Sequence, residues 1–243
     1  MPSQINNEFY NELGEDWYQA DDHAIALLRA EQKVKNNWVH REIQKNHPKA
    51  QAILDIACGG GFLSNSLAPH YTRVCGVDAS ETSIEIAKKH DETSKVEYQV
   101  ADAYKLPFVD DEFDVICLMD FLEHIEEPEK IIMEATRVLK PGGLLFYHTF
   151  NRNILSYFII IKAVEWLVPN APKNLHIYRL FIKPVELLGF LERNKLTCVS
   201  MLGIKPKFDK YFFKSILKRK VLPQFDFELT TSTTLAYLGM ARK

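Results

Sequence analysis

Five short apolar runs alternate with helical segments between residues 50 and 150. The runs are AILDIA, TRVCGVD, VEYQVA, FDVICLM and GLLFYHTF. The segments between them, such as SETSIEIAKKH and EPEKIIMEATRVL, have helical periodicity. Strands and helices that alternate at this spacing predict a parallel sheet with helices on both faces. Ligands of such a sheet bind at the carboxyl ends of its strands, so we expect the site there.

The rest of the chain predicts additions to one α/β domain, residues 1–243. We expect a Rossmann-like, doubly wound and mostly parallel seven-stranded sheet, with N-terminal helices and a helical substrate cap. Two late strand candidates, LTCVSMLGI and TTLAYLGMA, predict an antiparallel hairpin at one edge. The first two predicted parts are an N-terminal helical cap (1–49), with a helix from about Ala20 to His47, and a cofactor-binding core (50–150). A substrate cap or membrane-proximal insertion follows (151–182). The C-terminal part (183–243) contains a helix near Lys183 to Arg193 and a basic insertion at 205–228.

Composition excludes some classes of function. The chain has 243 residues, 47% of them hydrophobic, and a formal net charge of −2. This balance predicts a full core and argues against nucleic acid as a partner, because phosphate binding normally requires an excess of Lys and Arg. The N-terminal residues do not resemble a secretory signal, so we expect a cytoplasmic protein. The four cysteines form no C-x-x-C pair and are interpreted as reduced thiols.

Three glycines, Gly59 to Gly61, follow the first apolar run directly. A tight turn from strand to helix uses glycine where the backbone bends sharply or approaches a ligand. A dinucleotide fingerprint would require glycine at position 64, which is Ser64 here, and a phosphate-binding P-loop would require a following Gly-Lys-Ser/Thr. The turn therefore favours a nucleoside ligand that lacks a diphosphate.

Acidic residues lie at the ends of the first three apolar runs: Asp55, Asp78 and Asp102. A carboxylate at the tip of the second strand accepts ribose hydroxyls, and one at the third can accept from an adenine amine. Together the three acids suit an adenosine ligand with a cationic tail, which describes S-adenosylmethionine. The alternative interpretation is that each acid only caps a helix.

Several motifs resemble those of the class I S-adenosylmethionine-dependent methyltransferases. They are LDIACGGG, GVDAS, DAYKLPFVDDEFDVI and RVLKPGGLL, in this order. The runs DFLEHI, TFNRN and FIKPVELLGF look more specifically like the ubiquinone-biosynthesis O-methyltransferases of the UbiG type, which methylate hydroxyls of polyprenyl-substituted phenols and catechols. This resemblance covers most of residues 50–204 and weakens at both ends.

The resemblance implies a set of cofactor-binding residues. Ala57 stands where the family often has glycine, and this departure should be tolerated if the backbone there avoids positive φ. Lys35 lies nearest to the position of a family arginine that contacts the methionine carboxylate, although lysine lacks the bidentate fork of arginine. The full implied set is Lys35, Asp55, Ala57, Gly59, Gly61, Asp78, Ala79, Asp102, Ala103 and Met119.

A cluster of polar residues follows the fourth apolar run, in the sequence DFLEH. Asp120, Glu123 and His124 could hold a hard divalent cation, and the resemblance implies Mg²⁺ there. Such an ion would favour the phenolate form of a bound catechol. In the alternative without metal, Glu123 caps the next helix and His124 packs beside the substrate. The predicted catalytic residues are His124 first, then Glu123 and His148, with His176 a weaker candidate for taking the phenol proton.

An apolar segment, residues 154–168, predicts a cap or interfacial helix for an apolar phenol or quinone precursor, or a buried core helix. It is too short to span a membrane. Residues 205–220 mix lysines with aromatic residues, a pattern typical of peripheral contact with an anionic membrane; a solvated loop or RNA contact is the alternative. The resemblance also implies association with other quinone-biosynthesis proteins. The remaining alternatives for function are methylation of another small phenol or lipid, and a non-catalytic lipid-binding or assembly protein.

Overall fold

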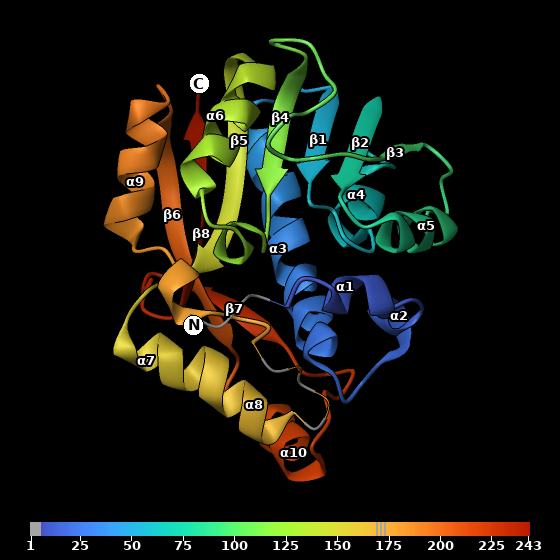
Figure 1. Ribbon diagram of the computed structural model, residues 1–243, viewed down its shortest axis with the longest axis vertical. Helices are drawn as coiled ribbons and strands as arrows, with labels where there is room; N and C mark the ends of the chain where they lie inside the picture. The colour runs from blue at the N-terminus through green and yellow to red at the C-terminus, as the bar shows by residue number, and fades with distance from the viewer. Residues whose placement is uncertain (1–5, 169, 171, 173) are drawn as a thin grey trace.

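The structure is a computed structural model that describes residues 6–168, 170, 172 and 174–243. Its centre is one sheet with the strand order β3-β2-β1-β4-β5-β8-β6-β7. The predicted mixed sheet, mostly parallel, is confirmed, but it has eight strands instead of seven (Figure 1). The strands are β1 (Ala52–Ile56), β2 (Arg73–Asp78), β3 (Val96–Val100), β4 (Phe113–Leu118), β5 (Leu139–Phe150), β6 (Thr197–Pro206), β7 (Phe227–Thr230) and β8 (Ala236–Arg242).

The parallel half of the sheet is covered by helices on both faces. On β1, Leu54 and Ile56 pack with apolar residues of α6 and α9, whereas Ile53 packs with those of α3 and α4. Both faces of β1 are therefore buried, as expected for an apolar run within a parallel sheet. The helices named here are α3 (Ala24–Asn46), α4 (Phe62–Leu67), α6 (Pro128–Val138) and α9 (Pro184–Arg193).

The two late strands pair with each other as predicted. β8 runs antiparallel to β6, with Leu202 opposite Leu238, and also antiparallel to β5, with Phe150 opposite Ala236. The edge itself is the extra strand β7, which pairs with the end of β6. The basic insertion thus contributes a strand as well as the helix α10 (Lys210–Lys218). This strand accounts for the difference from seven.

Two groups of helices lie beyond the carboxyl ends of the parallel strands (Figure 1). The first is the pair of short helices α1 (Phe9–Glu12) and α2 (Asp16–Gln19), which precede α3. The second follows β5 and contains α7 (Ile154–Ser156), a π-helical stretch (Tyr157–Ala163) and α8 (Val164–Leu167). None of the helices in the described part of the chain is long and apolar enough to cross a membrane. The division into four parts stays a prediction.

Candidate active site

A cavity of about 320 Å³ lies at the carboxyl ends of the strands. We call it the cofactor cavity. Its walls come from β1 and β2, from the loops that follow β1, β2, β3 and β4, and from the helices α1 to α4. Predicted cofactor residues that line it are Asp55, Ala57, Gly59, Asp78, Ala79, Ala103 and Met119.

The glycine turn is shaped by its backbone and by one tryptophan. Ala57 has φ +58°, so its backbone lies in the left-handed region and the condition for tolerating alanine without strain is not met. Gly59 also has a positive φ, and a Cβ there would lie 2.5 Å from the ring of Trp17. Glycine thus lets Trp17 of α2 cover the turn. Gly61 does not line the cavity: a Cβ on it would lie 2.4 Å from the Tyr98 hydroxyl, so glycine here serves packing.

The three predicted acids differ in their surroundings. Asp78 accepts hydrogen bonds from the amides of Gly59 and Ser80, both at 2.9 Å, and still lines the cavity. Asp55 is buried and accepts from the Ser64 hydroxyl at 2.6 Å. Burial raises the pKa of Asp55 to about 7, so this side of the cavity favours a cationic ligand group. Asp102 is exposed, accepts from the Tyr104 amide and does not line the cavity. Its adenine contact stays a prediction.

Lys35 does not line the cofactor cavity. Its ammonium is fully buried and donates to Glu31 Oε2 at 3.2 Å and to both carboxylate oxygens of Asp120, at 2.5 and 2.6 Å. An ammonium group has three protons, so its donors are fully used. The structure therefore gives Lys35 a different partner from the predicted methionine carboxylate.

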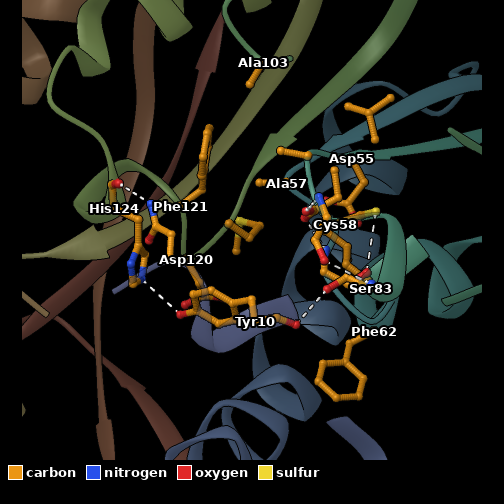
Figure 2. Close-up of a pocket in the computed structure, with 18 of the residues that line it drawn as sticks. Tyr10, Asp55, Ala57, Cys58, Phe62, Ser83, Ala103, Asp120, Phe121 and His124 are labelled. Carbon is orange, nitrogen blue, oxygen red and sulfur yellow. Dashed lines mark hydrogen bonds between the residues drawn. The ribbon is translucent and has the colours of Figure 1, made fainter. Parts of the chain in front are cut away.

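Glu123 and His124 lie in a short 3-10 helix after β4, Leu122–His124, and both side chains are buried. Glu123 Oε2 accepts from the Thr149 hydroxyl at 2.8 Å, and Oε1 has no hydrogen-bond partner in the described chain. Burial raises the pKa of Glu123 to about 7. Burial also lowers the pKa of His124 to about 4, so its ring is neutral at pH 7. The hydroxyl of Tyr10 lies 3.3 Å from His124 Nε2, and Figure 2 shows Tyr10 between His124 and Ser83.

The predicted magnesium ligands do not converge on one point. Among the described residues, acidic and histidine atoms lie within 4.8 Å of one another in a different group, Glu31, Asp120 and His148. Asp120 is already engaged: it accepts two hydrogen bonds from Lys35 and one from Gln32 at 2.9 Å, and His148 Nδ1 lies 2.6 Å away. The residues present therefore do not fit a magnesium ion.

His148 is fully buried and lines neither cavity. Burial and the Lys35 ammonium favour its neutral form, but the carboxylates of Asp120 and Glu31 outweigh them and raise the pKa of His148. The structure thus places this predicted catalytic residue behind the wall of the site, where it supports Asp120.

A second cavity, of about 170 Å³, adjoins the first. We call it the apolar cavity. Most of its lining is apolar and comes from α3, β5, β6, β7 and the helical segment after β5. The acidic or histidine exceptions are Glu31, Asp120, Glu123, His124 and His176. Both cavities share four wall residues: Tyr10, Leu28, Asp120 and His124.

Several of these residues were not predicted from the sequence. Tyr10 and Trp17 lie in a region where the family motifs are weak, and the paired aromatics FY and WY were the only signal. Thr149 is 26 positions from Glu123, which it contacts, and Glu31 is remote in sequence from His148, although it is only four residues from Lys35. Their roles require the fold.

The fold and the cavity define a class I S-adenosylmethionine-dependent methyltransferase. The family model of the methyltransferase domain matches residues 54–147. An S-adenosylmethionine-dependent methyltransferase from Thermotoga maritima shares the fold with a TM-score of 0.63 at 20% identity, over 97% of both chains. The ubiquinone biosynthesis O-methyltransferase of Coxiella burnetii is 34% identical over 197 residues, 80% of this chain and 82% of its own. That of Hydrogenovibrio crunogenus is 35% identical over 221 residues, 90% and 86% of the two chains. The chain belongs to the ubiquinone biosynthesis O-methyltransferase family.

Proposed function

We propose that the enzyme methylates a phenol or catechol hydroxyl of an apolar, polyprenylated quinone precursor bound in the apolar cavity. The observation that carries this proposal is the wall shared by the two cavities. A ring in the apolar cavity would present its hydroxyl to the cofactor cavity between Tyr10, Leu28 and His124. The printed names of the relatives support a substrate from ubiquinone biosynthesis.

When bound, S-adenosylmethionine supplies an electrophilic methyl group on a sulfonium. The chain contributes orientation and the exclusion of water, which favour a displacement between a cation and an anion. Trp17 covers the glycine turn, and Tyr10 covers the passage between the cavities. Asp55 and Asp78 line the cofactor cavity, and a bound sulfonium would favour their ionised forms, whose pKa burial raises.

The phenol must lose its proton, and two groups line the apolar cavity at the right place. Glu123 is the better base, because its pKa of about 7 matches neutral pH and Oε1 is unpaired within the described chain. His124, with a pKa of about 4, is a weaker base, and with Tyr10 it positions the ring. No magnesium ion takes part in this proposal, since Asp120 is already bound by the Lys35 ammonium and by Gln32.

The direct test is transfer of a labelled methyl group from S-adenosylmethionine to a short-tailed catechol. We expect label in the phenol ether, and we expect E123Q to lose most of the turnover while cofactor binding, measured by calorimetry, is kept. E127Q is the matched control, because Glu127 lies nearby but its side chain is 54% exposed. Absence of label transfer from an enzyme that still binds the cofactor would refute the proposed substrate.

We also propose peripheral contact with an anionic membrane, which would deliver a lipid-tailed substrate. The helix α10 exposes Phe213 and Leu217, 62% and 84% accessible, one turn apart on one face. The segment after β5 exposes Ile154 and Phe158 in the same way and also lines the apolar cavity through Ile159. Basic residues accompany α10: Lys207, Lys210, Lys214, Lys218, Arg219 and Lys220.

Sedimentation with vesicles tests this contact. The wild-type protein should sediment with phosphatidylglycerol vesicles but not with phosphatidylcholine vesicles. The L217D variant should no longer sediment with phosphatidylglycerol vesicles. The control V109D alters an equally exposed apolar residue, 69% accessible, in the loop before β4. Equal sedimentation of wild type and L217D would exclude α10 as the contact.

A further inference from the structure

The ammonium of Lys35 lies among the atoms that could otherwise hold a metal ion. Glu31, Asp120 and His148 each offer a ligand atom, and these atoms lie within 4.8 Å of one another. Lys35 Nζ lies 3.2 Å from Glu31 Oε2 and 2.5 Å from Asp120 Oδ2. Two carboxylates and one imidazole are a donor set that divalent metals such as Mn²⁺ accept. Here the set surrounds an amine.

This amine is a fixed positive charge. Burial alone would favour a neutral lysine, but the carboxylates of Asp120 and Glu31 outweigh it and raise the pKa of Lys35. The side chain is fully buried, and all three of its protons have acceptors. A buried cation with this geometry neutralises the acids around it.

The backbone at Asp120 fits the same arrangement. Its φ of +57° lies in the left-handed region, where aspartate is tolerated better than most residues. Gln32, on the same helix as Lys35, donates to Asp120 Oδ2 at 2.9 Å. The carboxylate is thus held from the α3 side by two neighbouring side chains, although Asp120 also lines both cavities.

We propose that Lys35 is a built-in cation that takes the place of a divalent metal ion between Glu31, Asp120 and His148. Two consequences follow. The wild-type protein binds no divalent metal in this cluster, and removal of the lysine side chain turns the cluster into a metal site. The inference concerns binding alone, so it does not depend on the substrate proposed above.

The test is a titration with Mn²⁺ followed by electron paramagnetic resonance, on wild type, K35A and K33A. We expect K35A to bind one Mn²⁺ at least about tenfold more tightly than wild type. Because the loss of one partner of a buried ion pair is strongly destabilising, K35A is also melted with and without Mn²⁺. Its melting temperature should rise with Mn²⁺, and that of wild type should not.

The control K33A removes the same charge from an exposed position on α3, so it should behave as wild type. The double variant K35A/D120N should lose the acquired site. A folded K35A that binds Mn²⁺ no better than K33A would overturn the proposal. If K35A does not fold even with Mn²⁺, the test is the Mn²⁺ titration of the wild-type protein. Mn²⁺ bound to wild type and lost in D120N would overturn the proposal. Absence of bound Mn²⁺ in wild type would support the proposal.

Discussion

Replacement of Ala57 by glycine should stabilise the protein, although it shortens a side chain at the centre of the site. The left-handed region, where Ala57 has φ +58°, costs a residue with a Cβ about 1 to 2 kcal/mol. Glycine avoids this strain but loses more backbone entropy on folding, about 0.5 to 1 kcal/mol. The net effect of A57G is a rise of about 0.7 kcal/mol in the free energy of unfolding. For a chain of this size it corresponds to a rise of about 2 °C in melting temperature.

Urea denaturation is the assay, with the midpoint measured at an unchanged slope. The matched control is A103G, because Ala103 lines the same cavity but does not have a positive φ. The free energy of unfolding of A103G should be lower than that of wild type by about 0.5 to 1 kcal/mol, because glycine loses more backbone entropy on folding than alanine. If A57G lost as much stability as A103G, the left-handed backbone at Ala57 would be refuted.

The remaining predictions concern the proposed chemistry. With saturating cofactor, kcat/KM for a catechol should rise with pH through about 7 as Glu123 loses its proton. This rise should be absent in E123Q. The same rise in E123Q would show that another group is the base. T149V removes the hydrogen bond to Glu123, so the rise of kcat/KM should shift to higher pH, and T149S should restore the wild-type pH range. An unshifted rise in T149V would mean that this hydrogen bond does not lower the pKa of Glu123. L28W should fill the passage between the cavities and reduce turnover by more than about tenfold at an unchanged cofactor dissociation constant, and wild-type turnover would contradict the shared wall.

Patterns that are local in sequence predicted most of the fold. The strands β1, β2, β4 and β5 follow mostly apolar runs bounded by turn residues, and such runs identify buried strands without tertiary information. The strand β3 is more polar and only partly buried. The strand β7 was not predicted, because its sequence FELT is short, half-buried and embedded in a basic segment. Only its pairing with β6 makes it a strand. Membership of a methyltransferase class followed from motifs of the same local kind.

The site was predicted less completely, because its contacts join distant positions. The sequence identified Asp55, Asp78 and Glu123, which lie in or just after strands. It did not show that Lys35 pairs with Asp120, 85 positions away, since no spacing rule relates residues of different elements. The backbone at Ala57 was likewise invisible, because φ depends on the turn and not on the residue alone. The predicted cytoplasmic location and the association with other quinone-biosynthesis proteins stay predictions.

The most direct test of the central claim is a crystal structure with S-adenosylhomocysteine and a short-tailed catechol bound together. The account predicts the nucleoside in the cofactor cavity against Asp78, and the ring in the apolar cavity with one hydroxyl at the wall formed by Tyr10, Leu28 and His124. A ring bound outside the apolar cavity, in an enzyme that still transfers methyl groups, would contradict it.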